Sequence, residues 1–275
     1  MLTLAAGLAL APGVAAAESA WQEVPGAKVR LVTVGRLGPD AKTPADAALE
    51  IQLEPGWHTY WRFPGEAGIP TEADFTRSRG LRGATLRFPA PKRYFDGQTT
   101  SIVYTDRVVL PIDLDIDPQA TSAMLSADVT FGVCRDICVP ATAALSLEIG
   151  AEDGSIMSRM AITRARLAIP KPQSEAAPRI ARIAGSTPDA NGERTLTIEA
   201  RLAPGALEAD LFAEGAPGSY IEVPRRIARD GTSATFALTT HGLARTDDGR
   251  PLSLVLVNGP VAVRHAIDAD TLSPR

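Results

Sequence analysis

The chain has 275 residues, roughly the length of two domains. Hydrophobic residues make up 45% and charged residues 22%, so the chain can bury a core. A net charge of −4, with no run of Lys and Arg, excludes an electrostatic footprint for nucleic acid. Two cysteines and three histidines in scattered positions exclude a four-ligand structural zinc site, so we expect no metal. The 22 prolines and 23 glycines favour short strands joined by turns over a helical bundle.

The beginning of the chain is apolar and is expected to direct export. Residues 2–17 carry no charge and end in Val14-Ala15-Ala16-Ala17 before Glu18. Such a region with an A-x-A site is typical of a secretory signal peptide, so we expect cleavage near Ala17. A membrane anchor is the alternative, although the stretch is short and rich in Ala and Gly. Export to an oxidising compartment makes a disulfide possible.

Strands dominate the next part of the chain. Apolar and polar residues alternate at 49–53, 110–116 and 145–149, which is the period of a half-buried strand. Turn residues such as Pro55-Gly56 and Asp96-Gly97 separate the candidates. Seven or so short strands predict an all-β domain, an antiparallel β-sandwich over residues 18–150. The remaining strands are expected at 29–34, 85–88, 102–104 and 124–130.

A helix and a linker are expected at 151–178. Four residues fall on one helical face and predict a helix over 153–168, capped by Asp153 or Ser155 and ended by Pro170. They are Ile156, Met160, Thr163 and Leu167. Residues 171–178 are rich in Pro, Ser and Ala and predict a linker.

Strands resume after the linker and predict a second β-sandwich domain at 179–275. It contains no cysteine and no recognisable catalytic grouping. We expect this domain either to bind a partner or to pack against the first domain through the helix. Its strands are expected at 196–200, 209–213, 220–223, 234–238, 252–257 and 261–267.

Cys134 and Cys138 follow a predicted strand. Four residues of extended chain span about 13 Å, whereas a disulfide needs roughly 4.4–6.8 Å between Cα atoms. The segment must therefore turn back, or make one helical turn, for the pair to bond. A loop this short stabilises the fold by only about 2 kcal/mol, against about 4.7 kcal/mol for a 100-residue loop. A local pair is better suited to reversible thiol–disulfide exchange.

Two other interpretations of the cysteines stay open, an inert local disulfide and a thiolate site for Cu(I). The copper site lacks a nearby His or Met. Beside the cysteines, Arg135 favours a thiolate and Asp136 opposes one.

Nine of the fourteen aromatic residues lie between positions 57 and 104. Phe88 and Tyr104 are expected in the core of the first domain. His58 is either a proton carrier near a thiol or a structural or surface histidine. Four other aromatic residues lie beside turn residues: Trp57, Tyr60, Tyr94 and Phe95. For these side chains, the sequence favours burial in the core and a position flanking the cysteines equally.

Four segments carry a family resemblance, in the order 56–65 (GWHTYWRFPG), 88–91 (FPAP), 103–111 (VYTDRVVLP) and 133–140 (VCRDICVP). They resemble the N-terminal periplasmic domain of the thiol:disulfide interchange protein DsbD, and most closely its ScsB-type branch. The resemblance covers about residues 28–150. The second β-domain is similar to the extension of the ScsB-type proteins. The cysteines are closer together here than in the classical domain.

The resemblance implies an immunoglobulin-like sandwich whose Cys134 and Cys138 are a redox pair that needs no cofactor. It implies a protein-disulfide reductase of the periplasm, with a membrane-embedded thiol reductase and periplasmic thioredoxin-fold proteins as partners. It also places His58 and Tyr60 near the site and an aromatic cap loop at residues 94–97. Because the 275 residues contain no later membrane-spanning stretch, we expect contact with the membrane only through a partner. The alternative is a non-enzymatic immunoglobulin-like binding protein with a structural disulfide.

Overall fold

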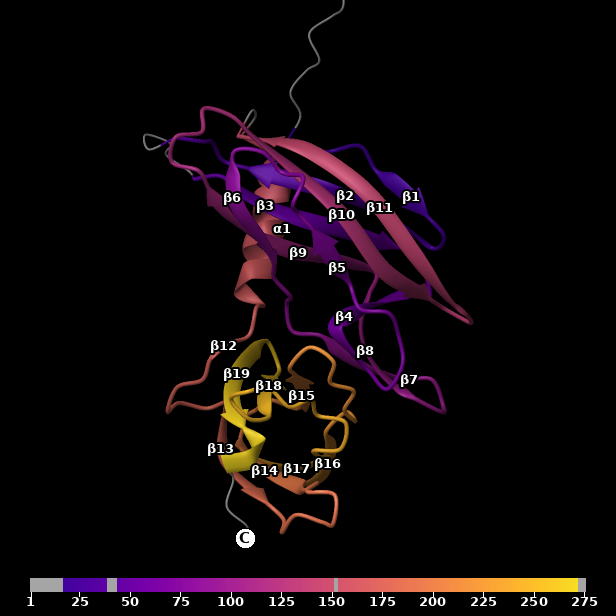
Figure 1. Ribbon diagram of the computed structural model, residues 1–275, viewed down its shortest axis with the longest axis vertical. Coiled ribbons are helices and arrows are strands. Elements are labelled where there is room, and N and C mark those ends of the chain that lie inside the picture. Colours follow the sequence, from indigo (N-terminus) through magenta and orange to yellow (C-terminus); the bar gives the residue numbers. More distant parts are fainter. Residues whose placement is uncertain (1–16, 39–43, 151–152, 272–275) are drawn as a thin grey trace, which may run out of the picture.

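The computed structural model describes residues 17–38, 44–150 and 153–271. In this part, the chain forms two β-sandwiches stacked along the long axis of the molecule, with a helix beside the first (Figure 1). None of the helices in these ranges has the length and apolar character needed to cross a membrane. The expected signal peptide lies outside the described residues, apart from Ala17.

The first domain is the antiparallel, immunoglobulin-like sandwich that the sequence predicts. One sheet has the order β1-β2-β3-β9-β6, and the other has the order β11-β10-β4-β8-β7, with β5 paired to β10. Its eleven strands are β1 (Gln22–Val24), β2 (Ala27–Val34), β3 (Asp46–Leu53), β4 (His58–Gly65), β5 (Glu72–Asp74), β6 (Leu81–Leu86), β7 (Lys92–Phe95), β8 (Thr100–Thr105), β9 (Arg107–Ile116), β10 (Ala123–Cys134) and β11 (Cys138–Ile149).

The long hairpin of β10 and β11 shows how the sequence determines the sandwich. Alternate residues of β11, from Ala141 to Ile149, are buried, and the residues between them are exposed. This is the period-2 pattern of a strand with one face on the core and one in water. Trp61 and Phe131 are fully buried in the same core, and Phe88 and Tyr104 are buried there as expected.

Helix α1 (Ile156–Leu167) forms where expected, but its apolar side faces solvent. Ser155 is the N-cap, and its side chain accepts a hydrogen bond from the amide of Ser158. The buried positions are Ser158, Ile162 and Ala165, and Ile162 packs against the outer face of β2, β3 and β9. The four residues that mark the predicted face are all exposed: Ile156, Met160, Thr163 and Leu167.

Arg166 accounts for the orientation of the helix. Its guanidinium donates to both carboxylate oxygens of Asp46, to Asp113 and to the carbonyl of Ile112. These bonds, together with the small side chains of Ser158 and Ala165, hold one side of α1 close to the sheet, because short side chains permit close approach.

The second domain is a sandwich of two four-stranded sheets, ordered β12-β19-β18-β15 and β13-β14-β17-β16. The predicted linker is partly wrong, because Lys171 and Pro172 form β12 and pair in parallel with β19. Residues 220–223 are not a strand. The strands are β12 (Lys171–Pro172), β13 (Arg179–Gly185), β14 (Thr195–Arg201), β15 (Ala209–Gly215), β16 (Arg225–Asp230), β17 (Ser233–Thr239), β18 (Pro251–Asn258) and β19 (Val261–Asp268), followed by the short helix η1 (Ala269–Thr271).

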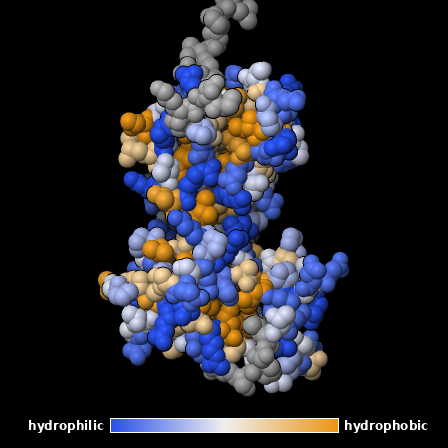
Figure 2. Space-filling view, turned by 90° about the vertical axis from the view of Figure 1, so that its left-hand side faces the viewer, coloured by the Kyte–Doolittle hydropathy of each residue, from blue (hydrophilic) through white to orange (hydrophobic). Residues whose placement is uncertain are grey.

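The two domains meet at β4 and β7 of the first and β15 of the second. Figure 2 shows a narrowed waist between the two lobes with many hydrophilic residues on its surface. Beneath that surface, Phe212 of β15 belongs to the same buried cluster as Trp61, and their ring centroids are 6.2 Å apart. The second domain therefore packs directly against strands of the first and not through α1, which packs on β2, β3 and β9.

Candidate functional site

The two cysteines close the end of the β10–β11 hairpin. Cys134 is the last residue of β10, Cys138 is the first of β11, and the two are direct partners in the antiparallel register. Their Cα atoms are 4.2 Å apart, and the sulfur atoms form a disulfide. Of the two geometries that could close this loop, the chain uses the reversal of direction and not a helical turn.

The two sulfur-bearing residues differ in exposure. Cys134 is 2% exposed and clusters with Tyr60 and Val103, whereas Cys138 is exposed. The difference arises because Cys134 lies against β4, where it pairs with His58, while β11 is an edge strand of its sheet. Cys138 is therefore the more accessible residue of the pair.

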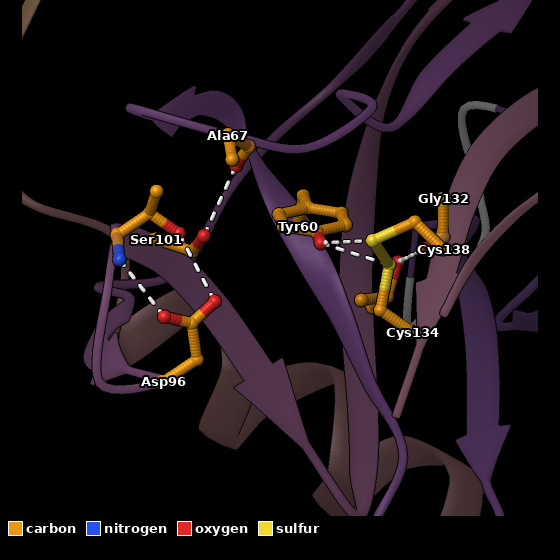
Figure 3. Close-up of a disulfide and its surroundings, with 9 residues drawn as sticks. Tyr60, Ala67, Asp96, Ser101, Gly132, Cys134 and Cys138 are labelled. Carbon is orange, nitrogen blue, oxygen red and sulfur yellow. Dashed lines mark hydrogen bonds between the residues drawn. A yellow bond between two sulfur atoms is a disulfide. The ribbon is translucent and has the colours of Figure 1, made fainter. Parts of the chain in front are cut away.

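Tyr60 of β4 points its hydroxyl at the disulfide (Figure 3). The hydroxyl oxygen lies 2.8 Å from Sγ of Cys134 and 3.0 Å from Sγ of Cys138. Disulfide sulfurs carry no hydrogen, so the tyrosine is the donor in both contacts. The ring fits because a Cβ atom at Gly68 would lie 2.2 Å from it, and one at Gly132 would lie 3.0 Å from it. These two glycines are a sequence signal for a closely enclosed side chain.

The environment keeps the Tyr60 hydroxyl protonated. Burial, together with the negative charge of Asp96 and a smaller contribution from Tyr94, raises the pKa of Tyr60 to about 12. The group therefore donates a hydrogen bond at any physiological pH. A donor fixed beside sulfur stabilises a thiolate that forms there, because hydrogen bonding to the charged form favours it.

His58, Tyr60 and Tyr94 form an aromatic cluster next to the disulfide. The ring of His58 is 5.4 Å from that of Tyr60 and 4.7 Å from that of Tyr94, measured between centroids. His58 is buried, and burial lowers its pKa below 6.5, while Asp96 acts in the opposite direction. His58 is therefore a buried, mainly neutral imidazole at neutral pH.

Asp96 lies within the cap loop expected at residues 94–97, but the sequence assigns it no role of its own, although it influences two members of the aromatic cluster. It begins the turn between β7 and β8, where its carboxylate accepts from the amides of Gln98 and Thr99 and from the Thr99 hydroxyl. These bonds lower the pKa of Asp96, so the carboxylate is ionised at neutral pH. The Asx-turn pattern D-G-x-T marks the turn in the sequence but not its proximity to β4.

Three of the other predicted flanking residues, Trp57, Arg135 and Asp136, lie around the hairpin loop. Arg135 places its guanidinium 5.2 Å from the ring of Trp57 and forms an exposed ion pair with Asp136. Trp57 packs over Gly26, where a Cβ would lie 2.4 Å from the ring, so it supports the hairpin loop through Arg135. Phe95 is 63% exposed at the end of β7.

Residues 30–148 match the protein family described as thiol:disulfide interchange protein DsbD, N-terminal. This stretch of the chain is a DsbD N-terminal domain. The match includes both strands of the cysteine hairpin and the aromatic cluster. The family match, together with the disulfide between Cys134 and Cys138, supports a thiol:disulfide interchange module.

The whole chain also shares its fold with a solved structure, the crystal structure of the N-terminal periplasmic domain of ScsB from Proteus mirabilis. The TM-score is 0.69 at 20% sequence identity, and the match covers 92% of this chain and 98% of that one. The shared fold therefore includes the second sandwich as well as the DsbD N-terminal domain. No curated protein sequence matches the chain significantly.

Proposed function

We propose that the chain is an exported redox module whose Cys134–Cys138 pair passes two electrons from a membrane-embedded thiol reductase to periplasmic thioredoxin-fold proteins. The family of residues 30–148 supports the interchange chemistry. The fold shared with a periplasmic domain supports the compartment. The observation that carries the proposal is the disulfide itself, which joins an exposed Cys138 to a buried Cys134 beside the fixed hydroxyl donor of Tyr60.

Reduction of the module begins at the exposed sulfur. A thiolate of the reductase attacks Sγ of Cys138, the Cys134–Cys138 bond breaks, and Cys134 leaves as a thiolate. That thiolate accepts a hydrogen bond from the Tyr60 hydroxyl, which already lies 2.8 Å from its sulfur. The second thiolate of the reductase then attacks the mixed disulfide and releases Cys138. Two electrons have entered the module, its two cysteine thiolates exchange protons with solvent, and the reductase holds a new disulfide.

Delivery of the electrons uses the same atoms in the opposite direction. The Cys138 thiolate attacks a disulfide of the thioredoxin-fold partner and forms a mixed disulfide. The Cys134 thiolate then attacks Sγ of Cys138, which restores the internal disulfide and releases the partner as a dithiol. Tyr60 keeps its proton through both steps because the pKa of its hydroxyl is about 12.

The first experiment is the equilibrium of the Cys134–Cys138 pair with glutathione buffers, read by thiol alkylation and mass spectrometry. An exchanging dithiol is expected to have a potential between about −180 and −280 mV. A pair that stays oxidised below about −300 mV is a structural disulfide, and this result would leave a binding module as the function.

The copper interpretation is tested in the same preparations. If the pair were a Cu(I) site, the reduced protein would bind Cu(I) in a chelator competition and Cys134→Ser would not. We expect no difference between the two proteins in that assay, because we assign the cysteines to disulfide exchange.

A further inference from the structure

The strand that carries Tyr94 belongs to the first domain, but its side-chain anchor lies in the second. Arg93 of β7 donates from Nε and Nη2 to the two carboxylate oxygens of Asp210 on β15, at 2.9 and 2.7 Å. The same Nη2 also lies 2.9 Å from the carbonyl of Pro224 and 3.3 Å from that of Leu211. One guanidinium of the redox domain is thus surrounded by acceptors of the other domain.

The geometry of this contact is that of a strong interaction. A two-pronged guanidinium–carboxylate pair fixes orientation as well as distance. Both side chains are about 70% removed from solvent, with Arg93 29% and Asp210 30% exposed, so screening by salt is reduced. The backbone of β7 depends on such an anchor because β7 has only four residues and pairs within its sheet only with β8.

The next residue along β7 connects this anchor to the redox site. Successive side chains of a strand point to opposite faces. Arg93 therefore faces the second domain, and Tyr94 faces the other way, where its ring lies 4.7 Å from that of His58. His58 is in turn the register partner of Cys134. A continuous series of contacts runs from Asp210 through Arg93, Tyr94 and His58 to the buried cysteine.

A second ion pair holds β4 in the same way. Arg62, two residues after Tyr60, donates to both carboxylate oxygens of Glu214 on β15, at 2.5 and 2.7 Å. The strands that carry Tyr60 and Tyr94 are thus both tied to β15, and we call Arg93–Asp210 and Arg62–Glu214 the junction ion pairs.

We propose that the second domain positions the aromatic cluster of the redox site, and that Arg93, held by Asp210, is the positioning residue that keeps Tyr94 against His58. The relevance of this inference to disulfide exchange rests on the proposed function, but the positioning of Tyr94 and His58 can be tested without it. Loss of the Asp210 charge replaces the two-pronged ion pair with at most one hydrogen bond to a neutral amide oxygen, which weakens the hold of β15 on β7. Tyr94 then withdraws from His58, and water reaches His58 and Cys134.

The test compares Asp210→Asn with Asp115→Asn in the full chain. Asp115 pairs with Arg82 between β6 and β9, so its variant removes a guanidinium–carboxylate contact elsewhere in the first domain. The first readout is the NMR titration of His58, with His265 of β19 as an internal standard, since burial lowers the pKa of both. Tyr60, Tyr94 and Asp96 are the titratable groups that face His58, and all three remain in each variant.

We expect Asp210→Asn to move the His58 midpoint by a few tenths of a pH unit toward 6.5 and to leave His265 unchanged. Asp115→Asn should move neither. In a Cys138→Ser background, Asp210→Asn should raise the iodoacetamide alkylation rate of Cys134 at least threefold. Asp210→Glu, which restores a carboxylate, should return both readouts most of the way to wild type.

Unchanged His58 titration and unchanged Cys134 alkylation in folded Asp210→Asn would overturn the positioning role. If Asp210→Asn did not fold, Arg93→Lys, which keeps the charge but not the two-pronged contact, would be measured in its place with the same criteria. The glutathione equilibrium of the wild-type protein separates this proposal from the function. A pair that stays oxidised in every glutathione buffer would refute disulfide exchange and leave the His58 result intact. A pair that exchanges, in a protein whose Asp210→Asn variant is unaltered, would refute only the positioning role.

Discussion

His58 and Cys134 are direct partners in the antiparallel register of β4 and β10. Side chains of such partners lie on the same face of a sheet, with Cβ atoms about 4.5–5.5 Å apart. Tyr60 is two residues further along β4 and shares that face, so one strand supplies both a hydroxyl donor and a buried imidazole to the cysteine. The chemistry of the disulfide is therefore set by how β4 pairs with β10.

The exposure difference between the cysteines predicts different reactivity of the two single variants. Cys134→Ser leaves the exposed Cys138 thiol, whereas Cys138→Ser leaves the buried Cys134 thiol. We expect the Cys138 thiol to react with iodoacetamide at least tenfold faster at pH 8. We also expect only Cys134→Ser to trap a stable mixed disulfide with oxidised glutathione. Equal rates in the two variants would contradict the proposed order of attack.

The Tyr60 hydroxyl is expected to accelerate opening of the disulfide. Tyr60→Phe removes the donor that lies 2.8 Å from the leaving sulfur of Cys134 and keeps the ring. Hydrogen bonds to charged groups contribute about 1.5–3 kcal/mol, so reduction by dithiothreitol at pH 7 should slow by roughly tenfold or more. Stopped-flow measurement of the reduction rate checks this.

Tyr104→Phe is the matched control for that measurement. It also removes a tyrosine hydroxyl, but one that donates to the carbonyl of Pro89 within the first domain and not to sulfur. Its reduction rate should equal that of the wild type. A wild-type rate in Tyr60→Phe would show that the hydroxyl does not assist the departure of Cys134.

His58 is expected to make stability depend on pH. Burial lowers its pKa in the folded protein, so between that value and about 6.5 the unfolded chain binds more protons than the folded one. The free energy of unfolding therefore falls as the pH drops from about 6.5 toward the folded-state pKa. Above about pH 6.5, the contribution of the neutral His58 to stability is fully present. His58→Gln removes this contribution.

Urea unfolding of the two proteins at pH 7.5, 6.5 and 5.5 measures the effect. The stability of the wild type relative to His58→Gln should be highest at pH 7.5 and should decrease mainly between pH 6.5 and 5.5. The contribution of His265, whose pKa burial also lowers, is present in both proteins and cancels. Parallel pH profiles would contradict a buried, neutral His58.

Several parts of the fold could be predicted from the sequence because they depend on local patterns. Alternation at 145–149 predicts a half-buried strand, and β11 has that burial over its whole second half. The short distance that a disulfide requires predicts that residues 134–138 bring their ends together, although the reversal and a helical turn satisfy it equally. The two cysteines could be selected because thiols carry this chemistry whatever their surroundings.

The rest of the site depends on contacts between distant parts of the chain. Tyr60 and Cys134 are 74 residues apart, and only the register of β4 against β10 brings the hydroxyl to the sulfur. Arg93 and Asp210 are 117 residues apart and lie in different domains. A single sequence contains no periodicity that reports such pairings, so Tyr60 could be named as a candidate but its role could not be stated.

The helix shows where a periodic signal is misleading. Spacing places Ile156, Met160 and Leu167 on one side of α1, yet all three are exposed, and Ile162 is buried against the sheet. The ion pairs of Arg166 with Asp46 and Asp113 determine which side faces the domain. These carboxylates lie more than 50 residues before Arg166 in the chain, so the orientation depends on tertiary contacts and not on apolar spacing.

The orientation of α1 predicts opposite consequences for two apolar truncations. Ile162→Ala creates a cavity against β2, β3 and β9 and should reduce the free energy of unfolding by about 2–4 kcal/mol. Met160→Ala trims a side chain that is 53% exposed and should change it by no more than about 0.5 kcal/mol. Both substitutions introduce alanine at interior helical positions, so differences in helix propensity stay small beside the packing effect. Urea denaturation followed by circular dichroism measures both, and a larger loss for Met160→Ala would mean that the apolar side of the helix is the buried one.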